Sequence, residues 1–158
     1  MSMNNRTVIV ITGPTASGKT TLGVSLALAL GTEVVSADSM QLYRGMDIGS
    51  AKIRPEEMDG VPHHLVDVLD PSEDFNVVLF QQMAKEAMEG IYQRGHIPIV
   101  VGGTGFYIQA LLYDIDFTDT AQDDTYRAEL ENLVKEKGAA YLHNMLRKVD
   151  LKSAEDIH

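Results

Sequence analysis

A glycine-rich segment near the start of the chain has the residue types and spacing of a phosphate-binding loop. Residues 13–20 read GPTASGKT and match G-x-x-x-x-G-K-[ST] at every fixed position. In such a loop, glycines allow successive backbone N–H groups to face a phosphate, Lys19 adds a positive charge, and the Thr20 hydroxyl can hold magnesium. The pattern predicts a phosphorylated ligand and leaves its identity open. The expected binding residues are Gly13, Pro14, Thr15, Ala16, Ser17, Gly18, Lys19 and Thr20.

Asp38 is the second candidate, because it follows a short apolar run at 33–36 that we predict to be a strand. In open α/β sheets the carboxyl ends of strands face the ligand crevice. A carboxylate there can act as a general base, reach magnesium through water, or only cap a turn. The strand predicted at 97–101 ends in Gly102-Gly103, where many phosphate-loop hydrolases carry a magnesium-binding aspartate. Asp38 is therefore the best-placed acid in this chain.

Two further features have competing interpretations. The turn at 102–105 offers the Thr104 hydroxyl at the same crevice edge, and it is equally typical of a plain strand-to-helix turn. His63 and His64 are adjacent, and neighbours in an extended segment point to opposite sides, which argues against one shared metal.

The elements that must position these residues alternate between strand and helix. The β-branched run at 7–11 predicts a central strand buried on both faces, and leucines at helical spacing predict a helix over 20–30. With the strand at 33–36 this opening is typical of a parallel α/β fold. Downstream we predict an irregular segment over 44–72 with a short helix near 55–58. A helix over 75–94, a strand over 97–101 and a helix over 106–112 should follow. The apolar stripe of the 75–94 helix is expected to be Leu79, Met83, Ala87 and Ile91.

The pattern changes after residue 114, where a polar cluster is followed by helical periodicity without strands. Helices are predicted over 124–137, 139–148 and 151–157. Arg127 lies four residues before Glu131, which is the spacing of a solvated ion pair on one helix face. We therefore expect a phosphate-loop core over 1–117 and the start of a helical insertion over 118–158.

Composition narrows the class of protein. The chain has 158 residues, 44% of them hydrophobic, with 13 basic and 23 acidic residues and a net charge of −10. These values exclude wholesale disorder and argue weakly against non-specific nucleic-acid binding. The absence of cysteine excludes disulfides, thiolate zinc sites and a cysteine nucleophile. The longest apolar stretch, at 22–30, is far shorter than the roughly 20 residues of a membrane span, so we expect a cytoplasmic protein without a membrane segment.

Four sequence blocks together resemble the tRNA dimethylallyltransferase (isopentenyltransferase) family. They are GPTASGKTTL, VVSADSMQLYRGMDIGSAK, VPHHLVDVLDP and IPIVVGGTGFYIQALL, and the similarity runs from about Val8 to His158. The second block is the most specific, because Asp38, Ser39 and Gln41 stand in it together with the GMDIG run and Lys52 in the family's order.

The resemblance implies a phosphate-loop kinase-like parallel sheet flanked by helices, with a helical insertion that grips the tRNA anticodon stem-loop. It implies transfer of a dimethylallyl group from dimethylallyl diphosphate to N6 of the adenosine beside the anticodon, assisted by Mg²⁺, by a monomeric enzyme. It gives catalytic roles to Asp38, Lys19 and Thr15, and places the diphosphate on residues 15–20. The residues it implies for tRNA are Asp38, Ser39, Met40, Gln41, Thr104 and Arg127.

Two other functions fit the phosphate loop. One is an ATP-dependent small-molecule or nucleotide kinase, and the other is a non-catalytic phosphate-binding module. Family members run to roughly twice this length, so we expect part of the core and of the insertion to lie beyond His158.

Overall fold

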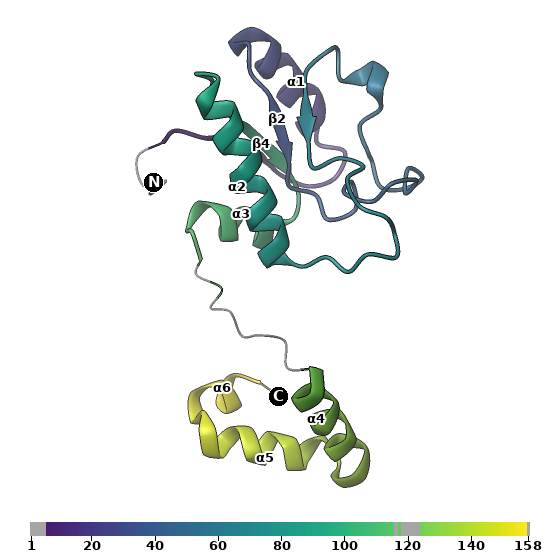
Figure 1. Ribbon diagram of the computed structural model, residues 1–158, viewed down its shortest axis with the longest axis vertical. Coiled ribbons are helices and arrows are strands. Elements are labelled where there is room, and N and C mark those ends of the chain that lie inside the picture. The colour runs from purple at the N-terminus through teal and green to yellow at the C-terminus, as the bar shows by residue number, and fades with distance from the viewer. Residues whose placement is uncertain (1–5, 116, 118–123, 158) are drawn as a thin grey trace. The chain divides into compact units, whose positions relative to one another are not determined.

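The computed structural model describes residues 6–115, 117 and 124–157. The chain divides into two compact units, residues 1–116 and 117–158. The first contains a sheet with helices, and the second contains helices α4 to α6 (Figure 1). No helix in the described part of the chain is both long and apolar enough to cross a membrane.

Four parallel strands form the sheet of the first unit in the order β1-β4-β2-β3. Their bounds are β1 (Ile9–Thr12), β2 (Val34–Ser36), β3 (His63–His64) and β4 (Ile99–Gly102). Every residue of β4 is buried, because β1 and β2 pair with its two edges. β1 is only half-buried and pairs with β4 alone among the described strands. The prediction that the first strand is central was therefore wrong for the described sheet, in which β4 has that place.

Helices cover both faces of this sheet. Their bounds are α1 (Lys19–Leu30), α2 (Val77–Gln93) and α3 (Gly105–Leu112), with a short 3₁₀ helix, η1 (Pro55–Glu57). Successive strand residues serve opposite faces: Val34 packs with α1, and Val35 packs with α2 and α3. The parallel α/β fold flanked by helices, predicted from the sequence, is confirmed.

Two predictions inside this unit were wrong in detail. The 44–72 segment was expected to be irregular, but His63–His64 pairs in parallel with β2. Its strand is two residues long and follows Pro62, so no alternating pattern marks it. Helix α2 begins at Val77, because the Asn76 side chain accepts from Leu79 N and caps it. Its buried residues are Phe80, Gln81, Ala84, Met88 and Ile91. The prediction for Ile91 is confirmed, whereas Met83 and Ala87 are only partly buried and Leu79 is 40% exposed.

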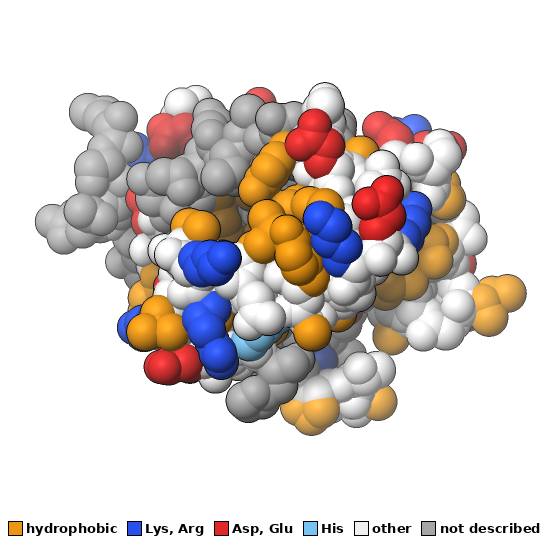
Figure 2. Space-filling model, turned by 90° about the horizontal axis from the view of Figure 1, so that it is seen from below, with side chains coloured by type: hydrophobic (Ala, Val, Ile, Leu, Met, Phe, Trp, Pro, Cys, Tyr) orange, Lys and Arg blue, Asp and Glu red, His pale blue; other side chains and the backbone are white. Residues whose placement is uncertain are grey.

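The second unit consists of α4 (Asp124–Lys137), α5 (Ala139–Val149) and α6 (Leu151–Asp156), close to the predicted helices. Gly138, at φ 81°, makes the turn between α4 and α5. His143 on α5 contacts α6 and the residue after it, since its Nε2 lies 2.8 Å from the Ala154 carbonyl oxygen and 3.0 Å from that of Ile157. A largely apolar cavity of about 700 Å³ lies between these helices. In the view of Figure 2, hydrophobic side chains gather with Lys and Arg side chains beside them.

The tightest backbone approach joins the ends of β2 and β4. A Cβ placed on Gly102 would lie 2.1 Å from the carbonyl oxygen of Ala37, whereas one placed on Gly103 would lie 3.6 Å from that of Gly13. The first distance is impossible without backbone movement, and the second is an ordinary contact. Glycine is thus required at position 102.

We expect Gly102→Ala to lower the free energy of unfolding by about 3 kcal/mol or more, because the added methyl forces the β2 and β4 ends apart. Gly103→Ala is the matched control and should cost less than about 1 kcal/mol. Urea unfolding at pH 7 measures both. Equal stability of the two variants would contradict the close approach.

A charged cluster fixes the start of β2 to the far end of α2. The partly buried Glu33 carboxylate accepts from Arg94 Nε at 2.6 Å and lies 2.7 Å from His64 Nε2. Burial opposes ionisation of Glu33, but the hydrogen bonds from Arg94 and His64 outweigh it and lower the pKa of the carboxyl. A lowered pKa in the folded protein stabilises the fold above the ordinary pKa of Glu, and this contribution is lost as pH falls through the lowered value.

Glu33→Gln should therefore reduce unfolding free energy at pH 7 by about 1–2 kcal/mol, because charged hydrogen bonds are lost. The difference from wild type should shrink as pH is lowered from 5 towards 3. Glu86 is exposed on α2, so Glu86→Gln is the control. It should leave the unfolding free energy unchanged at both pH values. Denaturant titrations across this pH range provide the measurement, and a pH-independent difference would rule out the ionised pair.

Candidate functional site

The phosphate loop runs from the end of β1 to the first turn of α1. Gly18, at φ 82°, is the N-cap of α1, and no side chain caps the helix there. Gly13 and Ala16 also have positive φ values, which turn the backbone back on itself. The first N–H groups of a helix have no partner within the helix. Here they remain available to an anion, as the sequence motif predicts.

Lys19 lies over this loop. Its Nζ donates to the carbonyl oxygen of Pro14 at 2.5 Å, so that the side chain folds back across the loop. A carbonyl partner does not neutralise the ammonium group. The positive charge is therefore held beside the backbone N–H groups, where a phosphate would meet both.

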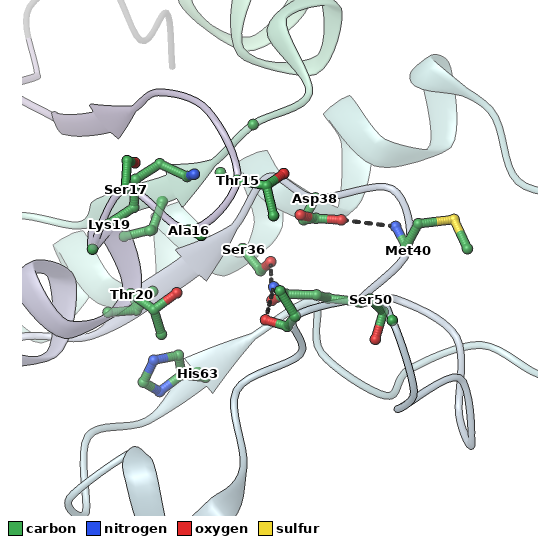
Figure 3. Close-up of a pocket in the computed structure, with 18 residues that line it drawn as sticks. Thr15, Ala16, Ser17, Lys19, Thr20, Ser36, Asp38, Met40, Ser50 and His63 are labelled. Atoms are coloured by element: carbon green, nitrogen blue, oxygen red, sulfur yellow. Dashed lines mark hydrogen bonds between the residues drawn. The ribbon is translucent and has the colours of Figure 1, made fainter.

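A cavity of about 390 Å³ opens beside the loop (Figure 3). Residues from five parts of the chain line it: the phosphate loop, the ends of β2 and β4, the segment from Gly49 to Ala51, and β3 at His63. The lining residues that could contact a ligand through polar groups are Thr15, Ser17, Lys19, Thr20, Ser36, Asp38, Gln41, Ser50 and His63. The cavity thus joins a phosphate-binding side to a side with a carboxylate and an amide.

Asp38 lies just beyond β2 and lines this cavity. Its Oδ1 accepts from Met40 N at 3.0 Å, which is the Asx turn considered as one interpretation of the sequence. Within the described residues its Oδ2 has no hydrogen-bond partner. Asp38 therefore both caps a turn and leaves one carboxylate oxygen available at the cavity, so the turn does not exclude a role in chemistry.

Thr104 fixes the position of the residues around Asp38. Ala37 N donates to the Val101 carbonyl oxygen at 2.8 Å, and Thr104 N donates to the Ala37 carbonyl oxygen at 3.2 Å. The Thr104 hydroxyl oxygen accepts from Ser39 N at 3.1 Å. Neither Ser39 nor Thr104 lines the cavity. In this structure their contacts hold the turn that carries Asp38.

Gln41 connects two walls of the cavity. The Ser36 hydroxyl donates to Gln41 Oε1 at 3.2 Å, and Gln41 Nε2 donates to the Ala51 carbonyl oxygen at 3.1 Å. These bonds tie the end of β2 to the wall formed by Gly49, Ser50 and Ala51. The amide of Gln41 is thereby held in one orientation.

Lys52, which follows Ala51, fixes the same wall through its own side-chain contacts. Its side chain is 4% exposed, and its Nζ lies 2.7 Å from Asp47 Oδ1, 2.5 Å from Asp67 Oδ1 and 2.6 Å from the Tyr43 carbonyl oxygen. Burial opposes the charge, yet the hydrogen bonds that Lys52 donates to the two aspartates raise its pKa above the ordinary value of a lysine. The lysine is thus a charged cross-link between the segments around residues 47 and 67.

His63 was not predicted to belong to the site, although it lines the cavity beside Thr20 (Figure 3). Burial lowers the pKa of His63, although the hydrogen bond to the Val61 carbonyl oxygen at 2.8 Å acts in the opposite direction. His64 turns away and pairs with Glu33. Only the parallel pairing of this short strand with β2, which the sequence does not signal, brings His63 to the cavity.

The structure assembles some of the predicted site residues and not others. Thr15 to Thr20, Asp38, Met40 and Gln41 line one cavity, while Gly13 and Pro14 do not. Arg127 lies in the helical unit, where its Nε is 3.4 Å from Glu131 Oε1 and both side chains are exposed. The solvated ion pair predicted for Arg127 is confirmed. The described residues include no group of three or more His, Cys, Asp or Glu side chains able to hold a metal.

Comparison with known proteins matches most of the chain to one family. The family model described as IPP transferase matches residues 41–158, and that described as isopentenyl transferase matches residues 6–70. The chain is 57% identical to a tRNA dimethylallyltransferase of Lachnoclostridium phytofermentans, covering 96% of this chain and 48% of the relative. It is 50% identical to one from Exiguobacterium sibiricum, covering 100% of this chain and 51% of that protein.

Solved structures support the same assignment. A full-length tRNA isopentenylpyrophosphate transferase from Bacillus halodurans is 51% identical, with a TM-score of 0.71, and the match covers 98% of this chain and 51% of that one. A eukaryotic dimethylallyltransferase, captured acting on tRNA, is 35% identical with a TM-score of 0.85, over 98% of this chain and 38% of that one. These relatives do not favour the kinase alternative. The chain spans about half the length of its curated relatives, and it belongs to the IPP transferase family.

Proposed function

We propose that the protein to which this chain belongs transfers a dimethylallyl group from dimethylallyl diphosphate to N6 of an adenosine beside the tRNA anticodon. The observation that carries the proposal is that the phosphate loop and Asp38 line the same cavity. The similarity to tRNA dimethylallyltransferases supports the choice of substrates.

The phosphate loop serves the leaving group in this scheme. The bond between C1 of the dimethylallyl group and the diphosphate oxygen breaks, and its electron pair leaves with the diphosphate. The backbone N–H groups of residues 15–20 and the Lys19 ammonium face the oxygens on which this charge develops. Preorganised donors of this kind stabilise the transition state more than the ground state. Thr15, the first lining residue of the loop, contributes a hydroxyl beside Asp38 (Figure 3).

Asp38 serves the nucleophile. As N6 of adenine forms its bond to C1, the nitrogen gains positive charge and must lose a proton. The Asp38 Oδ2 accepts that proton, because Oδ1 is already bonded to Met40 N. A target base in an RNA loop can be extruded at low cost. Met40 and Gln41 line the acceptor side of the cavity, and Ser39 and Thr104 support it.

The oxygen atoms that the cavity offers as metal ligands fit magnesium. This ion takes few protein ligands and completes its shell with water and substrate phosphates. The Thr20 hydroxyl and the Asp38 carboxylate line the same cavity as the phosphate loop. In the proposed complex the Thr20 hydroxyl would hold the ion. The ion would supply further charge neutralisation at the diphosphate.

The helical unit completes the proposal on the tRNA side. Arg127 is exposed on α4, and its pairing with Glu131 at 3.4 Å is weak enough to exchange for a phosphate. We assign residues 118–158 to the start of an insertion that contacts tRNA rather than the prenyl donor. The enzyme is proposed to act as a cytoplasmic monomer.

Lys19→Ala should weaken binding of dimethylallyl diphosphate by about 10–100-fold, which corresponds to loss of one charge-assisted hydrogen bond. Lys135→Ala, which removes an exposed charge from α4, is the matched control and should leave donor affinity unchanged. Calorimetric titration of the full-length protein measures both. Equal affinities of the Lys19 variant and wild type would exclude the loop as the donor site.

Asp38→Asn tests the acceptor side. As a general base Asp38 should contribute about 10²–10⁴-fold to the rate of transfer. The amide keeps the acceptor for Met40 N, so RNA and donor affinities should change little. Single-turnover transfer in the full-length enzyme, at saturating donor and across a magnesium series, provides the readout.

The magnesium series separates the alternatives for Asp38. If its role is to hold magnesium, added metal should restore part of the rate of the Asn variant. If Asp38 is only a turn cap, turnover should be unchanged, with at most about 1–2 kcal/mol of stability lost. Near-normal transfer by a folded variant would refute the catalytic role.

A further inference from the structure

The loop after β2 holds two large apolar side chains in solvent. Ile48 is fully exposed and Met46 is 36% exposed. Gly45 and Gly49, with φ values of 72° and 79°, reverse the backbone on either side of them. The segment projects from the body of the α/β unit (Figure 1). We call the side chains of Met46 and Ile48 the apolar knob.

Asp47, between the two knob residues, and Ser50, just after them, hold the knob in place. The exposed Asp47 accepts from the buried Lys52 side chain, with 2.7 Å between Oδ1 and Nζ. The Ser50 hydroxyl donates to the Met46 carbonyl oxygen at 2.6 Å. Burial of Ile48 would stabilise the protein, yet these bonds hold it outside. The exposure is therefore a property of an anchored loop.

The knob lies at the acceptor end of the cavity. Gly49 and Ser50, which follow it directly in sequence, line the cavity, and so does Met40, which is 42% exposed. Asp38 and Gln41 belong to the same end. A nucleic acid that delivers a base to Asp38 must therefore pass close to the knob.

An exposed cation, Arg44, precedes the knob by two residues in the sequence. Arg44 donates from Nε to the Asp67 carbonyl oxygen at 2.9 Å and from Nη2 to the Val68 carbonyl oxygen at 3.4 Å. Carbonyl acceptors orient the guanidinium without neutralising it. An apolar surface beside a fixed positive charge is the combination that binds unstacked bases and their phosphates.

We propose that the apolar knob packs against a base adjacent to the target adenosine in the RNA loop, with Arg44 facing the phosphate backbone. The proposal rests on the proposed function, since it concerns how that acceptor is presented. An apolar side chain that takes the place of an extruded base keeps the neighbouring bases from restacking. The knob would thereby hold the loop open while the adenosine occupies the cavity.

Ile48→Ser in the full-length enzyme tests this inference. Leu30→Ser is the matched control, because Leu30 is an exposed aliphatic side chain, 50% accessible, at the opposite end of α1 from the cavity. We expect Ile48→Ser to weaken binding of an anticodon stem-loop RNA by about 5–10-fold, with donor affinity and thermal stability unchanged. Ile48→Met should retain wild-type binding. With 2-aminopurine beside the target position, the fluorescence increase on binding should be smaller for Ile48→Ser than for wild type.

Two results would overturn the inference. The first is RNA binding and 2-aminopurine fluorescence equal to wild type in Ile48→Ser. The second is a loss of thermal stability or donor affinity in that variant, which would place the knob against protein rather than RNA. Failure of the proposed function has a separate signature, which is the absence of dimethylallyl transfer by the wild-type enzyme.

Discussion

The close contact between the ends of β2 and β4 determines how the site is built. Ala37 is hydrogen-bonded to the end of β4 through both its N–H and its carbonyl oxygen. At position 102 only glycine fits against that carbonyl oxygen. The turn that carries Asp38 starts at this point, and Thr104 holds it by accepting from Ser39 N. β1, on the other edge of β4, delivers the phosphate loop to the same end of the sheet. One backbone contact thus places the carboxylate opposite the anion-binding loop.

The two sides of the cavity are held by different physical means. On the donor side, glycine conformations and an uncapped helix end expose backbone N–H groups, so the site depends on the backbone more than on side chains. On the acceptor side, a chain of side-chain bonds runs through Gln41 to the wall at Ala51, and buried Lys52 fixes that wall to Asp67. Because a buried lysine without its carboxylates would be costly, the acceptor wall is as strongly specified as the sheet.

The local sequence pattern predicted most helices and strands, but it predicted less well how they pack against one another. The phosphate loop, α1 and the three C-terminal helices follow from glycine positions and helical periodicity, which act within one segment. β3 was missed because a two-residue strand is defined by its partner β2 and not by its own sequence. The same reason explains the absence of His63 from the predicted site. Ser50 was missed because its wall is held at the cavity by the bond from Gln41 to the Ala51 carbonyl oxygen, which no local pattern signals. Asp38 was predicted because it follows the end of a predicted strand. Only the structure shows that its Oδ1 accepts from Met40 N while its Oδ2 stays available.

The central claim is that donor and acceptor meet in this one cavity. A crystal structure of the full-length protein with a non-reactive thiolo analogue of dimethylallyl diphosphate and an anticodon stem-loop RNA tests it most directly. We expect the diphosphate on the backbone N–H groups of residues 15–20 and adenine N6 beside Asp38 Oδ2. The reacting carbon should lie about 3–3.5 Å from N6. An adenine bound outside the cavity, or a diphosphate away from the loop, would contradict it.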